Sequence, residues 1–363
     1  MRTRRVVWLR RPRGLLLSLL GLGLALAAAA AAPVAPTAAA AAPAAGAAPA
    51  AAAASAAAAA AAPASAAAPA AAPVGAARTP ATFVVPAELR DLDAFLTGVA
   101  AIPGLPARLE AASRPFLGVP YKLDALGEGP GAPDADPLWD FTRCDCQTLV
   151  EEVLALTFSH DRAEFEARMR ALRYVGGAVA YEARRHLVEP RWLPGLVAEG
   201  YLREVTPDVG GAATATATLV VDDRPLAPKF EKLRKKVGGA WPAGTYALRY
   251  VPIDVAIARH AAIPAGTVLL PVRAPVPDSP FLVSHMGLVL VRDGKRLFRH
   301  ASSSPIFKKV VEQSLPGYLG FLKRYFADKD RPVIGVAVYE VTDPGPLRPT
   351  TTAAPPATTH GTP

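Results

Sequence analysis

The sequence predicts an α+β fold in which a helix that carries a cysteine packs on an antiparallel β-sheet. Two observations support this fold class. Patterns of helical period dominate up to about residue 200, whereas alternating or continuously apolar patterns typical of strands dominate beyond it. An Asp-Gly pair also joins two of the strand patterns, which is a strong signal for an antiparallel hairpin. Helices followed by strands favour an α+β domain.

The predicted helices begin early in the core. Apolar residues recur at near-helical spacing over 87–111, and the interruption at Pro103–Pro106 divides them into two short helices. The sequence CQTLVEEVLALTF, which starts at Cys146, predicts a longer helix with Asp145 as a good N-cap. Cys146 is then expected in the first turn of that helix.

Three further segments surround this helix. A segment rich in Gly, Pro and Asp, residues 127–136, predicts a loop before it. A second helix is expected over about 162–172, followed by a mixed stretch over 181–200 with Trp192 as an aromatic anchor. The basic segment 228–237 predicts a helix, whose charges we interpret as a solvated face.

The predicted strands lie toward the C-terminus and alternate or run apolar. They are Ala213–Asp222, Thr267–Val272, Ser284–Val291, Arg296–Ala301 and Val333–Val341.

The predicted hairpin brings two histidines together. The segments SHMGLVLV and RLFRHA flank Asp293-Gly294. With a loop of two or four residues, Gly287 faces His300 and Ser302 faces His285. The two histidines then share one face on a diagonal of roughly 7–8 Å, at which their imidazoles meet. A three-residue loop would place them on opposite faces.

The composition divides the 363-residue chain into parts. About 263 residues, 80–342, are expected to form one folded domain. Of the 47 residues over 31–77, 33 are alanine, and residues 15–77 carry no charge, so residues 33–79 predict a disordered linker. Residues 343–363 predict a disordered tail. This composition excludes a disulfide-dense miniprotein, an array of obvious period and a multi-span membrane protein.

The net charge of +9 is concentrated at the N-terminus. Residues 1–14 hold six arginines and no acidic residue, so the remainder carries +3 and a nucleic-acid partner is not expected. An apolar stretch over 15–32 and small residues suited to cleavage follow. Residues 1–32 therefore predict a secretory signal and a periplasmic or extracellular domain. If this signal stays uncleaved, it is a membrane anchor.

A cysteine at a helix start and two histidines on one sheet face are the parts of a thiol hydrolase. The helix N-terminus is expected to favour the thiolate, one imidazole accepts the proton, and the other orients the first. Taken alone, such residues are more often an inert buried cysteine and hydrogen-bonded core histidines.

A set of short motifs favours the catalytic interpretation. They are GVPY at 118–121, DCQTLVE at 145–151, SHMGLV at 284–289 and HASS at 300–303, with RRH at 184–186 and Trp192 between them. In this order the set resembles the NlpC/P60 superfamily of papain-like cell-wall hydrolases. It resembles more closely the N-acetylmuramoyl-L-alanine amidase-like family within it, over roughly residues 95–342.

The resemblance implies a papain-like fold and a role for each matched residue. Cys146 would be the nucleophile, His285 the general base and His300 the orienting residue. Tyr121 would lie beside the site to hold substrate or the oxyanion, for which the Cys146 N–H is a further donor. Asp145 would cap the helix and contact the stem peptide.

The same resemblance implies that Arg184 and His186 line the substrate groove. A surface arginine and a structural histidine are the alternative. The expected partner is peptidoglycan or muropeptides, and no cofactor or metal is implied.

Several alternatives remain open at this level. The expected bond joins N-acetylmuramic acid to L-alanine, but the superfamily more often cuts γ-D-glutamyl-diaminoacid bonds. Cys146, His285 and His300 could instead bind zinc, with Cys144 as a spare ligand, although their spacing matches no recognisable zinc motif. A non-catalytic wall-binding protein is the third class. In an oxidising space, a strained Cys144–Cys146 bridge would switch the enzyme off.

Overall fold

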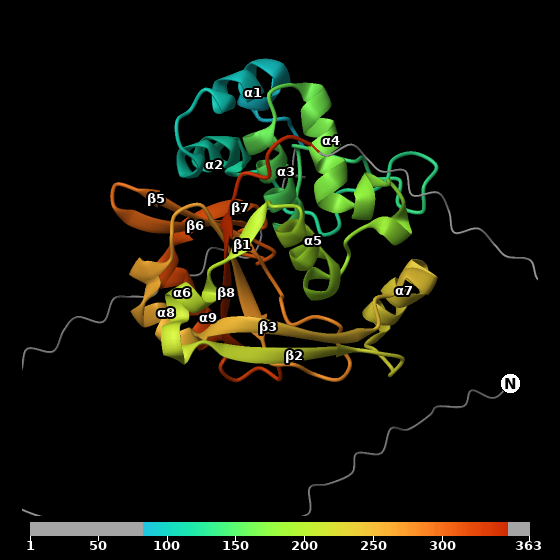
Figure 1. Cartoon of the computed structure of the whole chain (residues 1–363), viewed down its shortest axis with the longest axis vertical. Coiled ribbons are helices and arrows are strands. Elements are labelled where there is room, and N and C mark those ends of the chain that lie inside the picture. Colours follow the sequence, from blue (N-terminus) through green and yellow to red (C-terminus); the bar gives the residue numbers. More distant parts are fainter. Residues whose placement is uncertain (1–82, 348–363) are drawn as a thin grey trace, which may run out of the picture. The chain divides into compact units, whose positions relative to one another are not determined.

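The computed structural model describes residues 83–347, whose helices and strands are labelled in Figure 1. The helices are α1 (Leu92–Ala100), α2 (Leu105–Ser113), α3 (Cys146–Phe158), α4 (Arg162–Arg173), α5 (Leu193–Ala198), α6 (Thr206–Gly210), α7 (Pro228–Val237), α8 (Ile253–Ala258) and α9 (Leu315–Phe326). The strands are β1 (Leu202–Glu204), β2 (Ala215–Val221), β3 (Gly244–Pro252), β4 (Thr267–Arg273), β5 (Gly287–Arg292), β6 (Lys295–Ala301), β7 (Val310–Ser314) and β8 (Val333–Val341).

The predicted signal, the linker and most of the predicted tail lie outside the described residues. Within residues 83–347, no helix combines the length and the apolar character that crossing a membrane would require.

An antiparallel sheet organises the described residues, as the predicted α+β class requires. Its order is β2-β3-β8-β4-β5-β6-β7, with β1 paired to β8. Helices α1 to α5 lie over one face, and α6, α8 and α9 lie against the other (Figure 1). In β4, Val268 and Leu270 join the first core and Leu269 joins the second. Because both faces are covered, this strand is apolar without alternation.

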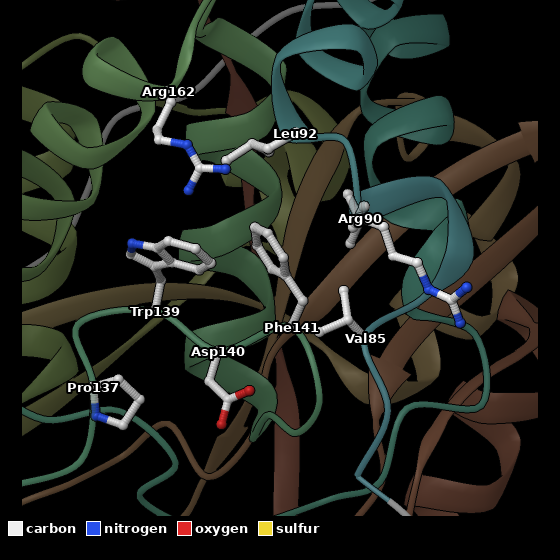
Figure 2. Close-up of a pocket in the computed structure, with 9 residues that line it drawn as sticks. Val85, Arg90, Leu92, Pro137, Trp139, Asp140, Phe141 and Arg162 are labelled. Carbon is white, nitrogen blue, oxygen red and sulfur yellow. The ribbon is translucent and has the colours of Figure 1, made fainter.

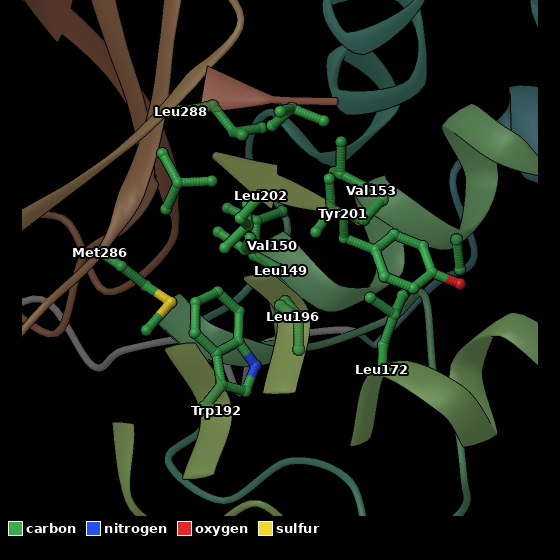
Figure 3. Close-up of a cluster of buried hydrophobic side chains, with 14 of the residues drawn as sticks. Leu149, Val150, Val153, Leu172, Trp192, Leu196, Tyr201, Leu202, Met286 and Leu288 are labelled. Atoms are coloured by element: carbon green, nitrogen blue, oxygen red, sulfur yellow. The ribbon is translucent and has the colours of Figure 1, made fainter. Parts of the chain in front are cut away.

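Helix α3 fills the centre of the first core. Its Leu149, Val150 and Val153 are fully buried and gather with Trp192 and Met286 (Figure 3). The predicted anchor role of Trp192 is confirmed, since its side chain is fully buried and its Nε1–H donates to Glu151 at 2.9 Å. The start of α3 is therefore held firmly against the sheet.

The elements around residues 87–113, 146–173 and 228–237 match the predicted helices, and β2, β4, β6 and β8 match predicted strands within a few residues. The predicted strand Ser284–Val291 is wrong at its start, because β5 begins at Gly287. The prediction that Ser302 faces His285 is also wrong, because β6 ends at Ala301. The sequence patterns did not identify β3, β7 or α9.

Candidate active site

The Cys146 thiol lies at the N-terminus of α3. Asp145 caps this helix as predicted: its Oδ1 accepts the N–H groups of Gln147 at 3.0 Å and Thr148 at 2.9 Å. The Thr148 hydroxyl in turn accepts the Asp145 N–H at 2.8 Å, which completes a capping box. Cys146 is half-buried in the first turn, whereas Cys144 is fully buried in the core.

A bulge in the sheet aims His285. Val272 bridges Val283 and Leu269 pairs with Gly287, so two residues of β4 oppose the three residues Ser284–Met286. An extra residue of this kind bends a strand and redirects its side chains. Because of this bulge, β5 begins at Gly287 rather than at the predicted Ser284. The Met286 N–H in the bulge lies close enough to the Cys146 thiol to lower its pKa.

The β5–β6 hairpin has the predicted two-residue loop. Arg292 pairs with Lys295, and Asp293 and Gly294 both have positive φ, as a type I′ turn requires. Gly287 lies against His300: a Cβ at Gly287 would stand 2.8 Å from the His300 Cβ. Only glycine leaves room for the histidine at this crossing.

A chain of hydrogen bonds runs from the bulge to β7. His285 Nε2 and His300 Nδ1 are 2.7 Å apart, and His300 Nε2 and the Gln313 side-chain oxygen are 3.0 Å apart. An amide oxygen only accepts, so His300 Nε2 carries the proton and His300 Nδ1 accepts from His285 Nε2–H. The remaining nitrogen, His285 Nδ1, then carries no proton and has a free lone pair.

Aromatic side chains enclose His300. Its ring stacks on Phe298 with centroids 4.9 Å apart, and the Tyr318 ring lies 5.1 Å away. Neither Gln313 nor Tyr318 was identified from the sequence. The apolar period of LPGYLGFLKRYF, with Pro316 in the first turn of α9, is the signal that could have located Tyr318.

Burial keeps the thiol and the base neutral. Burial, together with the Asp145 carboxylate, raises the pKa of Cys146 to about 12, against the effect of the N–H groups of Met286, Cys146 and Gln147. Burial and the neighbouring His300 lower the pKa of His285 to about 3. The N–H groups at the helix N-terminus lower this pKa, as expected, but burial and the Asp145 carboxylate outweigh them.

Tyr121 lies beside the thiol. Its backbone N–H donates to the Lys308 carbonyl at 2.9 Å, and its backbone forms an isolated parallel β-bridge with Cys144. Burial, and then the charges of Cys146 and Asp145, raise the pKa of its hydroxyl. Tyr121 is thus a neutral hydroxyl close to Cys146 and Asp145. The structure therefore places Tyr121 and Asp145 beside Cys146 and joins His285 to His300, and Met286, the neighbour of His285, lies close enough to Cys146 to affect its pKa.

Arg184 belongs to a buried ionic cluster next to these residues. Its guanidinium contacts Asp124 at 3.2 Å, Glu128 at 2.6 Å and Asp134 at 2.9 Å. Burial opposes its charge, but the hydrogen bonds with Asp134 and Glu128 raise its pKa. The alternative of a surface arginine is wrong, because its side chain is 8% exposed. The cluster holds the 127–136 loop, and the Asp124 N–H donates to Asp145 at 3.0 Å.

His186 lies beyond Arg184 and does not join the cluster around the thiol. Its Nε2–H donates to the Tyr181 carbonyl at 2.8 Å, and its ring lies 4.5 Å from the Tyr181 ring. Burial lowers its pKa to about 4, although the hydrogen bond to Tyr181 opposes that shift.

Known proteins share sequence and fold with this chain. Residues 111–323 match the family model described as N-acetylmuramoyl-L-alanine amidase-like. The chain belongs to this amidase-like family. The matched range contains every residue of the candidate site, including Gln313 and Tyr318. No curated protein sequence matches the chain.

Solved structures share the amidase-like fold. A Legionella pneumophila protein assigned to DUF1460 has 21% identity and a TM-score of 0.59 over 71% of this chain and 95% of its own. An N-acetylmuramoyl-L-alanine amidase from Bacteroides uniformis has 23% identity and a TM-score of 0.50 over 66% of this chain and 99% of its own. These likenesses establish a shared α+β fold.

The zinc alternative does not fit the arrangement in this amidase-like protein. Both cysteines are free thiols in this structure, with Cys144 buried and Cys146 half-buried. The two imidazoles of His285 and His300 bond to each other rather than converge on one point. Across residues 83–347, no group of three His, Cys, Asp or Glu is placed to hold a metal ion.

A cavity of about 550 Å³ lies elsewhere on the amidase-like domain. Trp139, Phe141 and Arg162 line it together with residues near the start of α1 (Figure 2). It contains none of the predicted site residues. This cavity is therefore not part of the candidate active site, which consists of the side chains described above.

Proposed function

We propose that the protein is a secreted cysteine amidohydrolase that cleaves the N-acetylmuramoyl–L-alanine bond of peptidoglycan. The observation that carries this proposal is the hydrogen-bonded chain His285–His300–Gln313 next to a half-buried thiol, in a member of the amidase-like family. A papain-like fold of the NlpC/P60 superfamily fits a cysteine helix packed on an antiparallel sheet, and is part of the proposal.

In this mechanism Cys146 is the nucleophile. As its sulfur attacks the amide carbonyl, the thiol proton passes to His285 Nδ1, and His285 then gives that proton to the leaving amine. The carbon–nitrogen bond breaks and a thioester joins the acyl group to Cys146. Water, deprotonated by His285, hydrolyses the thioester and restores the thiol.

The neutral resting pair determines when the proton moves. Burial raises the pKa of Cys146 and lowers that of His285, so both groups are neutral before substrate binds. In the proposed mechanism the proton moves as the sulfur attacks. The imidazolium formed in that step is stabilised by His300, whose own orientation is held by Gln313.

The remaining predicted residues contact or shape the substrate site. The Cys146 N–H and the neutral Tyr121 hydroxyl are donors for the oxyanion. Asp145, already a helix cap, contacts the stem peptide. Arg184 and His186 line the substrate groove, and Arg184 pairs with Asp124, whose N–H donates to Asp145.

The decisive experiment incubates the purified chain with a defined muropeptide and with intact sacculi, and identifies products by mass spectrometry. Wild type is expected to release a stem peptide with a new N-terminal L-alanine, and Cys146→Ala is expected to lose at least a thousandfold in rate. Cys144→Ala is the matched control and should retain activity. A thiol alkylator should inactivate the enzyme, and a chelator should not.

Other products would redirect the proposal. Cleavage after D-glutamate would keep the cysteine mechanism and change the bond to the γ-D-glutamyl-diaminoacid linkage. Sacculus binding without any product would favour a wall-binding protein. Retention of activity by Cys146→Ala would refute the proposed nucleophile.

A further inference from the structure

The positive charge of the domain is concentrated on helix α7. This helix, Pro228–Val237, contains four lysines, one arginine and one glutamate, which give it a net charge of +4. Residues 15–363 carry +3 in total, so all of them outside α7 sum to −1. Figure 1 shows α7 at the margin of the molecule. The charge is therefore a feature of one surface and not of the whole domain.

The four lysines lie on one side of α7. At 3.6 residues per turn, their positions fall within an arc of about 120° around the helix axis. All four are exposed, whereas Val237 is buried and the Phe230 ring packs against the Phe281 ring with centroids 5.4 Å apart. The helix therefore rests on an apolar side and presents its lysines to solvent. We call the lysine face the following four residues: Lys229, Lys232, Lys235 and Lys236.

The lysine face lacks compensating carboxylates. Within residues 83–347, none of its four lysines forms a salt bridge, and Glu231 of the same helix is already paired with Arg234 at 2.8 Å. Lys232 lies three and four positions before Lys235 and Lys236, a spacing at which like charges on a helix repel each other. An anionic partner bound to this face would offset that repulsion.

Contacts connect the lysine face to the candidate active site. The Lys236 Nζ lies 5.4 Å from the centroid of the Tyr181 ring, and the Arg184 guanidinium carbon lies 5.1 Å from the same centroid. Arg184 pairs with Asp124, whose N–H donates to Asp145, the cap of α3. The lysine face therefore lies beside the residues that line the proposed substrate groove.

Polymeric peptidoglycan carries charges that complement this face. A γ-D-glutamyl-diaminoacid bond uses the γ-carboxyl group of D-glutamate and leaves the α-carboxyl group free to ionise. Stem peptides with this linkage therefore add a carboxylate each, and a polymer presents many of them. A group of lysines attracts such a polymer across about 10 Å at about 0.1 M salt, because that is the range over which exposed charges interact.

We propose that the lysine face is a docking surface for polymeric peptidoglycan, which it binds through the carboxylates of the stem peptides. This proposal rests on the proposed function for the identity of the polymer, and it adds a surface that takes no part in bond cleavage. An anionic lipid bilayer would also attract lysines. The contacts through Tyr181 and Arg184 favour the polymer, because they place this face beside the groove that receives it.

The test measures binding of the purified chain to intact sacculi by co-sedimentation, in a Cys146→Ala background in which no bond is cut. The glutamine variant, Lys229→Gln/Lys232→Gln/Lys235→Gln/Lys236→Gln, should bind about tenfold more weakly at about 50 mM salt. Arginine at the same four positions should preserve binding, because it keeps the charge. Glutamine and arginine are both good helix formers, so α7 is expected to fold in both variants.

The matched control removes four exposed cations from α9, the segment after it and the β5–β6 hairpin. It should bind sacculi like its Cys146→Ala parent, although its net charge equals that of the glutamine variant. The changes are Lys295→Gln, Lys323→Gln, Arg324→Gln and Lys329→Gln. If the glutamine variant does not fold, as judged by circular dichroism, the double variant Lys229→Gln/Lys232→Gln decides, with an expected loss of about threefold.

Salt and chemical modification test the nature of the attraction. Raising the salt concentration from about 50 mM to about 500 mM should weaken binding about tenfold, because exposed charges are screened. Converting the carboxylates of the sacculi to amides should remove the difference between the glutamine variant and its parent. Equal binding of the folded glutamine variant and its parent to untreated sacculi would overturn the proposal. So would a loss of binding to phosphatidylglycerol vesicles in that variant without any loss on sacculi.

These outcomes are distinct from those of the amidase experiment. Weaker sacculus binding by the glutamine variant would support the docking surface even if wild type released no product. Release of product by wild type, together with unchanged binding by the glutamine variant, would overturn the docking surface and leave the amidase proposal intact.

Discussion

Two polar clusters flank the start of α3, and they are built on opposite principles. On one side Arg184 holds its charge among three carboxylates. On the other side His285 and His300 are both kept neutral and share a directional hydrogen bond, and Gln313 completes the chain. Ion pairs between Arg184 and the carboxylates hold a loop in place without any proton transfer. Two neutral, hydrogen-bonded imidazoles, by contrast, leave one ring nitrogen free to accept a proton. The first cluster therefore supports the fold, and the second is the one that the proposed mechanism uses.

The largest effect is expected from breaking the ionic cluster. Arg184→Met leaves Glu128 and Asp134 buried without their partner, and should lower the free energy of unfolding by about 3–5 kcal/mol. Urea denaturation measures this. Arg224→Met is the control, because Arg224 pairs with Asp222 on the surface, and it should match wild type. Equal stability of both variants would show that the cluster is not structural.

A smaller effect, on activity, is expected at Gln313. Gln313→Leu removes the acceptor that orients His300, and should lower kcat about a hundredfold with little change in KM or unfolding midpoint. Gln313→Glu restores an acceptor oxygen and should recover part of the rate. Nitrogen NMR of the histidines should show protonated Nε2 on both rings in wild type. Protonated Nδ1 on both rings would contradict the proposed proton arrangement.

The crossing of β5 and β6 allows a steric test of the same cluster. In Gly287→Ala the new Cβ would lie 2.7 Å from the Arg299 carbonyl and 2.8 Å from the His300 Cβ, and should cost about 1–3 kcal/mol. Gly98→Ala in α1 is the control, since nothing lies within 4 Å of its Cβ. It should be neutral or stabilising by less than about 1 kcal/mol. Thermal unfolding compares the two, and equal midpoints would contradict the close packing.

The smallest effect concerns pH. The folded-state pKa of His285 lies near 3, below the unfolded value of 6.5, so the unfolded chain binds more protons between these values. Stability should be complete above pH 6.5 and decline as pH falls toward 3. His285→Asn removes one such group and should reduce the fall in Tm between pH 7 and pH 5 by about 2–4 °C. Parallel curves for the two proteins would show that His285 is not held neutral.

Much of this arrangement could be predicted from local patterns. The helix period and the Asp145 cap predicted α3, and Asp293-Gly294 predicted the hairpin and the place of Gly287 opposite His300. The bulge at Ser284–Met286 could not be predicted, because it depends on pairing with β4. Gln313 was missed for a similar reason, since its role exists only where β7 pairs with β6.

The sequence by itself therefore determined the elements whose signals are local: residue period, capping groups and turn residues with positive φ. Only the tertiary structure decided which side chains meet and in what protonation state. Arg184 finds its carboxylates 50 to 60 residues away along the chain, and His285 reaches His300 through a bulge. The Cys146 thiol is neutral because of burial and Asp145, although the helix start alone favours a thiolate. Desolvation depends on everything that packs around a group, and no local pattern encodes it.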